Sequence, residues 1–238
     1  MSTLPSAPDD IPPNQPLHGP NGPQTRVMLR PIATSLPLGY LAFALGMIIM
    51  AADSLGWVDD EQVLVGVLLA SYVFPLQLVA TVMAFLGRDT VGATTLGLFT
   101  TSWLAFGLLD IVSRPGSTPT VLGLFSISFG VVVAGLAVAA SRAKPLFTVV
   151  LAICSLRAVL AGLHVLTGSS GLQRAAGYVA LVATATAAYL GFALLIESAW
   201  PRAVLPLLRR GEAVSAMNGK LSAVRPGLPG EPGVREQL

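Results

Sequence analysis

The sequence predicts an all-α membrane protein, a bundle of six transmembrane helices with both termini in the cytoplasm. Hydrophobic residues make up 53% of the chain and charged residues only 11%, whereas soluble domains carry about 25% charged residues. Six apolar runs are each long enough to cross the ~30 Å hydrocarbon core of a bilayer as a helix. The basic residues gather on one side of these runs, and this bias predicts the orientation.

The six runs are separated by short connections that contain glycine, proline or charged residues, all of which end helices. The first run stops at Asp53, and the later connections that carry breakers are 87–89, 113–116, 142–145 and 168–171. Backbone groups in lipid must be hydrogen bonded within their own segment, so runs of this length form helices. In chain order, the runs cover residues 36–52, 63–86, 91–111, 119–140, 145–167 and 175–196.

The distribution of Lys and Arg predicts a plasma-membrane protein with both tails inside the cell. If both termini are cytoplasmic, the outer side holds only Arg114 and Arg174. Lys and Arg concentrate in the cytoplasmic loops of membrane proteins, which supports this orientation. The basic residues that it places inside are Arg26, Arg30, Arg88, Arg142, Lys144, Arg202, Arg209, Arg210, Lys220, Arg225 and Arg235.

The two ends of the chain differ in composition from the middle. Residues 1–34 are rich in proline and polar residues and predict a disordered cytoplasmic tail, because such a segment buries too little apolar surface to fold. Residues 207–238, with scattered glycines and charges, predict a second flexible cytoplasmic tail. The six-helix transmembrane domain is expected over residues 35–206.

The sequence contains no constellation that would support catalysis. It has no phosphate-binding glycine loop, no HExxH motif, no nucleophile elbow and only one cysteine, Cys154, which reads as a packing residue. Its two histidines are too few for a convergent metal site. We therefore expect no enzyme activity, no metal, no cofactor and no nucleic-acid partner.

Arg157 stands near the middle of the fifth run, where an arginine costs roughly 2.5–3.5 kcal/mol to insert and normally faces a partner or a water path. Ile153, Arg157, Leu160 and His164 follow helical spacings and should form one stripe. Arg157 could attract an anion, or it could form a structural ion pair with Asp110 or Glu197. His164 could couple transport to protons, or it could be an interfacial histidine bonded to a loop carbonyl.

Gln77 lies inside the second run, beside Tyr72 and Pro75. A buried amide in lipid must find a partner, so Gln77 is expected to face the bundle. Pro75 frees carbonyl groups in the preceding turn, which suits either a transport pathway or a simple kink. In the sixth run, small residues such as Ala183, Ala187 and Gly191 indicate either close packing within the chain or an oligomer interface.

The sequence resembles the acetate uptake transporter family, of the succinate–acetate permease type, as a divergent member. Its first-helix signature is matched by Pro37, Leu38 and Gly39, with Phe43 a few residues later. The other matching positions are Tyr72 and Gln77 on the second helix, Phe99 and Ser102-Trp103-Leu104 on the third, Ala176-Gly177-Tyr178 and Tyr189-Leu190 on the sixth, and Arg202-Ala203-Val204-Leu205-Pro206 after it.

This resemblance implies a six-helix protomer in a homo-oligomer, by family pattern a hexamer, that moves acetate and related small carboxylates, either with protons or as a channel. It also implies an apolar constriction at Phe43, Phe99 and Ile153, which would gate by excluding water. The family pattern has an apolar residue at the position of Arg157, so an arginine there is particular to this branch.

The prediction is therefore a membrane transporter or channel for acetate and similar small monocarboxylates, with Arg157, Gln77, Tyr72 and His164 along the pathway. Its partners would be the lipid bilayer, a small carboxylate anion and protons. Two alternatives remain open. The same fold could move another small solute such as ammonium, or the protein could be a non-transporting membrane partner or sensor with its pathway plugged by Phe74.

Overall fold

The computed structural model describes residues 33–58, 61–87, 89–113, 119–141, 145–199 and 205–206. Within these residues it contains helices only, and six spans are long and apolar enough to cross a membrane, which confirms the predicted all-α, six-helix class. The chain is thus a multi-pass membrane protein. Most of the two predicted tails lies outside the described residues. The elements are α1 (Leu36–Ser54), α2 (Gln62–Leu68), η1 (Leu69–Val73), α3 (Phe74–Leu86), α4 (Thr90–Val112), α5 (Thr120–Ala140), α6 (Pro145–Thr167) and α7 (Ser170–Ala199).

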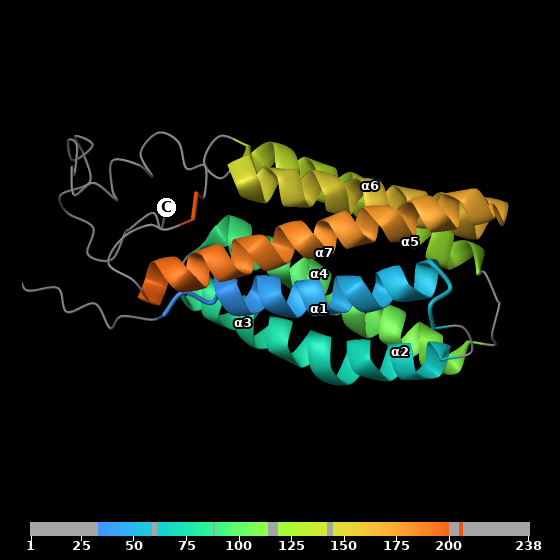
Figure 1. Ribbon diagram of the computed structural model, residues 1–238, viewed down its shortest axis with the longest axis horizontal. Coiled ribbons are helices and arrows are strands. Elements are labelled where there is room, and N and C mark those ends of the chain that lie inside the picture. Colours follow the sequence, from blue (N-terminus) through green and yellow to red (C-terminus); the bar gives the residue numbers. More distant parts are fainter. Residues whose placement is uncertain are drawn as a thin grey trace, which may run out of the picture.

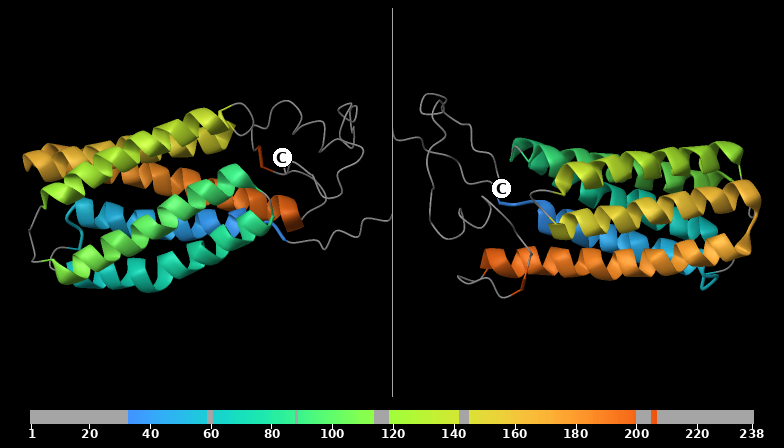
Figure 2. Two further views of the ribbon diagram at one scale, coloured as in Figure 1. Left: turned by 180° about the vertical axis from the view of Figure 1, so that it is seen from behind. Right: turned by 90° about the horizontal axis from the view of Figure 1, so that it is seen from above.

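The spans lie side by side and enclose a common interior (Figures 1 and 2). Helix α1 packs on α7, α7 on α6 and α6 on α5, while α1 also contacts α3, which packs on α4. The contact between α4 and α5 that completes the ring is much smaller. Helix α1 begins and α7 ends at the same end of the bundle (Figure 1). We call this the terminal end and the opposite one the far end.

The second span is not one continuous α-helix. Its middle, Leu69–Val73, is π-helical and leads directly into α3, where Pro75 occupies the first turn. Proline has no N–H to donate to the preceding turn, and π segments accommodate such a break by widening the helix by one residue. The sequence analysis left open a transport pathway or a simple kink at Pro75, and the structure has a π segment immediately before it.

Two pairs of facing glycines bring helix backbones into close contact. A Cβ atom on Gly162 of α6 would lie 2.7 Å from the carbonyl oxygen of Gly123 on α5. A Cβ on Gly66 of α2 would lie 2.5 Å from the carbonyl oxygen of Gly107 on α4. Small residues let transmembrane helices approach in this way, and without a hydrophobic driving force in lipid such packing carries much of the association energy.

Helix α7 starts five residues earlier than the sequence predicted, at Ser170 instead of residue 175. The connection from α6 is correspondingly tight, because Gly168 adopts a positive φ of 69° that ends α6. The side chain of Ser169 then accepts a hydrogen bond of 3.4 Å from the backbone N–H of Leu172. This serine cap starts the helix before the apolar run begins, so Gly171 and Arg174 lie inside α7 and not in a loop.

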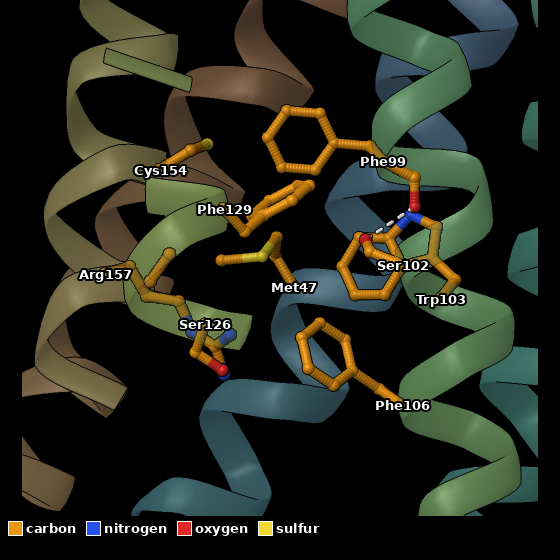
Figure 3. A pocket seen from close by; sticks show the side chains of 10 residues that line it. Met47, Phe99, Ser102, Trp103, Phe106, Ser126, Phe129, Cys154 and Arg157 are labelled. Atoms are coloured by element: carbon orange, nitrogen blue, oxygen red, sulfur yellow. Dashed lines mark hydrogen bonds between the residues drawn. The ribbon is translucent and has the colours of Figure 1, made fainter. Parts of the chain in front are cut away.

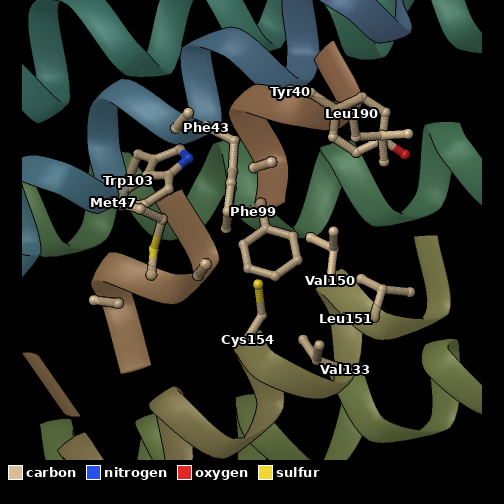
Figure 4. Close-up of a cluster of buried hydrophobic side chains, with 14 of the residues drawn as sticks. Tyr40, Phe43, Met47, Phe99, Trp103, Val133, Val150, Leu151, Cys154 and Leu190 are labelled. Carbon is tan, nitrogen blue, oxygen red and sulfur yellow. The ribbon is translucent and has the colours of Figure 1, made fainter. Parts of the chain in front are cut away.

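The interior of the bundle is centred on aromatic side chains from α1 and α4. The rings of Phe43 and Phe99 meet edge to face with centroids 5.0 Å apart, and Trp103 lies 5.6 Å from Phe43. Phe129 of α5 extends the cluster, 5.1 Å from Phe99. The sulfur of Cys154 on α6 points at the Phe99 ring (Figure 4). Edge-to-face pairs add about 0.5–1.5 kcal/mol beyond their buried area, so this cluster is a firm element of the core.

Candidate functional site

Arg157 is buried in the interior, with only 7% of its surface exposed. Its Nε makes no hydrogen bond to any residue that the structure describes. The side chain projects from the middle of α6, and its guanidinium end lies beside Ser126 of α5 (Figure 3). A buried charged donor that lacks a partner is costly, so its presence calls for an explanation in terms of a ligand, water or function.

Arg157 lines a cavity of ≈ 20 Å³ between α1, α4, α5 and α6, which we call the arginine cavity. About 10–15 Å³ of such space holds one water molecule, so the cavity accepts a water-sized group without rearrangement. Its other walls are mostly aromatic and apolar, with Ser102 and Ser126 as the neutral polar residues. The lining residues are Met47, Phe99, Ser102, Trp103, Phe106, Ser126, Phe129, Cys154, Arg157 and Ala158.

The sequence analysis named Asp110 and Glu197 as ion-pair partners for Arg157, and the structure places both away from it. Asp110 stands near the far end of α4, where its Cβ would be 2.9 Å from a Cβ on Gly66. Glu197 is in the last turn of α7, at the terminal end. A further carboxylate, that of Asp53, stands at the end of α1. That residue is exposed.

A second cavity, also of ≈ 20 Å³, lies on the terminal side of the first, and we call it the glutamine cavity. Phe99 and Cys154 line both cavities and therefore stand between them. Phe43, packed against Phe99, belongs to the wall of the glutamine cavity. Its lining residues are Tyr40, Phe43, Gln77, Thr95, Leu96, Phe99, Phe147, Val150, Leu151 and Cys154.

Gln77 is fully buried, and its amide links three helices. Its Nε2 donates to the carbonyl oxygen of Gly39 on α1 at 3.2 Å, and its Oε1 accepts from Trp103 Nε1 on α4 at 2.7 Å. One turn further along α3, Thr81 donates to the backbone of Gln77 and contacts the hydroxyl of Thr100 at 3.0 Å. Gln77 thus faces the bundle, lines the glutamine cavity and fixes the position of Trp103, which lines the arginine cavity.

Three other sequence candidates lie away from these cavities. Tyr72 is 52% exposed on the outside of the single chain. His164 is half-buried near the far end of α6, and its Nδ1 lies 2.9 Å from the carbonyl oxygen of Ser169 in the following connection. Ile153 is half-buried and packs at the edge of the core, while the neighbouring Cys154 occupies the position between the cavities.

The residues of the first-helix signature serve packing. Pro37 is in the first turn of α1, where a missing N–H costs no hydrogen bond. Leu38 is 38% exposed and points away from the interior. Gly39 lies against α4, since a Cβ there would be 2.7 Å from Leu96, and its carbonyl group receives the hydrogen bond from Gln77.

The sequence analysis did not single out Thr95, Ser126 or Phe129, and it assigned Cys154 to packing alone. The buried face of α6 is rotated by about one residue relative to the predicted stripe. It contains Val150, Leu151, Cys154, Arg157 and Ala158. Cys154 and Arg157 are about one helical turn apart, so the sequence alone was compatible with both residues lying on the same face of α6. Ser126 and Thr95 are single hydroxyls in apolar runs, and only the tertiary structure brings them to cavities.

The described residues contain no group of three or more His, Cys, Asp or Glu side chains that could hold a metal ion. Both cavities instead combine aromatic walls with one or two polar groups. The arginine cavity places a guanidinium beside space for a water-sized group, while the glutamine cavity offers an amide and a hydroxyl without charge. This is the pattern of a small-solute site, in which a few polar groups orient the ligand within apolar walls.

Comparison with known proteins identifies the fold and the family. In structure, the chain is similar to the protein titled the bacterial acetate channel SatP, with a TM-score of 0.68 and 20% sequence identity over 74% of this chain and 99% of that one. At this identity the likeness shows the shared fold. No curated protein sequence matches the chain. The model of the GPR1/FUN34/yaaH family matches residues 19–207, most of the sequence, and confirms the predicted resemblance. The chain belongs to the GPR1/FUN34/yaaH family.

Proposed function

We propose that this protein is a membrane transporter or channel for acetate and similar small monocarboxylates, and that Arg157 draws the anion into the bundle. The observation that carries the proposal is the buried guanidinium beside a cavity, with an Nε that no described residue satisfies. A carboxylate would supply the missing acceptor through a charge-assisted hydrogen bond. Membership of the family and the fold shared with a protein titled an acetate channel support the same solute class.

The pathway in this proposal runs along the bundle axis through the arginine cavity and the glutamine cavity. Phe43, Phe99 and Cys154 form the barrier between them, and each cavity has room for a water-sized group. A solute with a methyl group passes only when a ring moves aside. An apolar constriction of this kind gates by excluding water, so the carboxylate must give up its hydrating water to pass it.

The buried cation also separates this proposal from its alternatives. A guanidinium repels ammonium, so a pathway through the arginine cavity favours an anion over that solute. The non-transporting sensor is the alternative that an uptake experiment must test, because the barrier between the two cavities is closed in this conformation. A transport function is further supported over an enzymatic one by membership of the family and by the fold shared with a protein titled an acetate channel.

The proposed protein resides in the plasma membrane with both termini in the cytoplasm, which the excess of Lys and Arg on that side supports. We extend the proposal to a homo-oligomer, a hexamer by the family pattern, in which each protomer keeps its own pathway. Proton coupling would need a titratable group on the pathway. The contact of His164 with the Ser169 carbonyl supports a structural role for this histidine.

The test is uptake of labelled acetate by proteoliposomes that contain the purified protein. Replacing Arg157 with Gln should lower uptake about tenfold or more, since a hydrogen bond to a charged group contributes about 1.5–3 kcal/mol. Arg174→Gln is the matched control, because Arg174 is an exposed arginine on α7, and it should leave uptake unchanged. Wild-type uptake by Arg157→Gln would remove the role of Arg157. If the native protein carried no short carboxylate, the sensor alternative would stand.

A further inference from the structure

Thr95 carries the second buried polar atom that finds no partner among the described residues. Its side chain is 3% exposed, and its Oγ1 makes no hydrogen bond. Threonines in transmembrane helices usually donate to a carbonyl of the preceding turn, as Thr81, Thr101 and Thr184 do here. Thr95 also lies in a transmembrane helix, but its hydroxyl makes no such bond to the preceding turn. A hydroxyl left without a partner in lipid-embedded protein costs stability, so it needs another reason.

The surroundings of Thr95 supply that reason. The residue lines the glutamine cavity together with Gln77, and no charged residue is in the described lining of that cavity. The amide nitrogen of Gln77 carries two hydrogens, and the described contacts use one of them, toward Gly39. The cavity therefore joins one free hydroxyl to one amide that still has a hydrogen to donate.

We propose that Thr95 and Gln77 form a second, uncharged binding site for the carboxylate group of the transported solute, and that this site selects carboxylates over spherical anions. The inference rests on the proposed function. A carboxylate has two oxygens and can accept from the Thr95 hydroxyl and the Gln77 amide at once, whereas a chloride ion offers a single centre without the two separated acceptors.

This division of roles follows from the two cavities. Arg157 recognises charge, and a guanidinium attracts chloride as well as acetate. Thr95 and Gln77 recognise the arrangement of acceptors, and they lie beyond the barrier of Phe43, Phe99 and Cys154. An anion that passes the barrier keeps hydrogen-bond partners only if its shape fits this pair. The solute is handed from a charged site to an uncharged one, so neither site binds it too tightly to release it.

The experiment uses the full chain in proteoliposomes and measures uptake of labelled acetate and of labelled chloride in parallel. Thr95→Val keeps the shape of the side chain and removes the hydroxyl. It should lower acetate uptake about tenfold or more, the loss expected for a hydrogen bond to a charged group, and leave chloride uptake unchanged. Thr95→Ser, which keeps the hydroxyl, should retain acetate uptake. Thr101→Val is the control for the same change on the exposed side of α4.

Thermal unfolding in detergent separates this role from a structural one. Because the Thr95 hydroxyl has no protein partner, Thr95→Val should not lower the unfolding temperature even as acetate uptake falls. Acetate uptake equal to that of the native protein, or an equal fall in acetate and chloride uptake, would overturn the proposed site. Either result would leave the proposed function standing as long as native uptake occurs and Arg157→Gln lowers it.

Discussion

Trp103 Nε1 donates a hydrogen bond of 2.7 Å to Oε1 of Gln77, and neither side chain is exposed beyond 2% of its surface. The bond joins the terminal half of the second span to the third. It also holds the indole ring against Phe43, at the boundary between the two cavities. The same amide contributes to the helix packing and to the wall of the pathway.

The Gln77–Trp103 bond is expected to stabilise the bundle measurably. Gln77→Leu leaves the indole N–H buried without an acceptor, and Trp103→Phe leaves the amide oxygen without its donor, so each should lower the free energy of unfolding by about 1–3 kcal/mol. In a double-mutant cycle the pair should show a coupling of about 0.5–2 kcal/mol. Unfolding in detergent measures all three variants, and strictly additive effects would contradict the coupling.

The Gly123–Gly162 contact should tolerate no side chain. Gly162→Ala places a Cβ 2.7 Å from a backbone oxygen that has no flexible way to retreat, and 2.7 Å from Ile127. We expect a loss of about 1–3 kcal/mol in unfolding free energy, as for other overpacked sites. Gly135→Ala on α5 is the control, because nothing lies within 4 Å of the added Cβ. That change should be neutral or stabilising by up to about 1 kcal/mol, since alanine favours the helix.

Arg157 should cost the protein stability, in contrast to a structural ion pair. Arg157→Met removes a buried guanidinium without a hydrogen bond at Nε and keeps a flexible apolar chain in its place. The unfolding free energy should rise by about 1–3 kcal/mol, in line with the insertion cost of a central arginine, while acetate uptake falls. A marked drop in stability would instead reveal a partner that holds Arg157 in place.

The single cysteine is a built-in probe of the barrier. Cys154 is buried and lines both cavities, so a small water-soluble thiol reagent that reaches it should block acetate uptake. Cys154→Ala should transport and resist the reagent. Labelling should quicken in the presence of acetate, because passage of the solute requires the rings of Phe43 and Phe99 to move. Labelling at one rate with and without acetate would argue that the barrier stays closed.

The class of fold was readable from the sequence because lipid imposes simple demands. Apolar runs of about 20 residues must form helices, and the six predicted runs correspond to the six spans. Boundaries were less certain, since the cap at Ser169 lies outside the apolar pattern that marked the start of α7. The burial of Arg157 and Gln77 followed from the cost of polar groups in lipid.

The contacts between helices could not be read in the same way. Whether Ile153 or Cys154 lies at the barrier depends on a rotation of α6 by about one residue, and an almost uniformly apolar run carries no signal of its rotation. Thr95 and Ser126 reach the cavities only through the packing of α4 and α5 against their neighbours. The glycine pairs likewise have meaning only where two helices cross.

The π segment at Leu69–Val73 determines which residues of the second span face the neighbouring helices. Gly66 and Gln77 are about three turns apart, so an unbroken α-helix would present both on one side. The extra residue rotates the two halves by about 100° relative to each other. Gly66 therefore lies against Gly107, while Gln77 reaches both Gly39 and Trp103. Deleting a single residue between these halves would remove this rotation. Every side chain on one half of the span would then face a new neighbour.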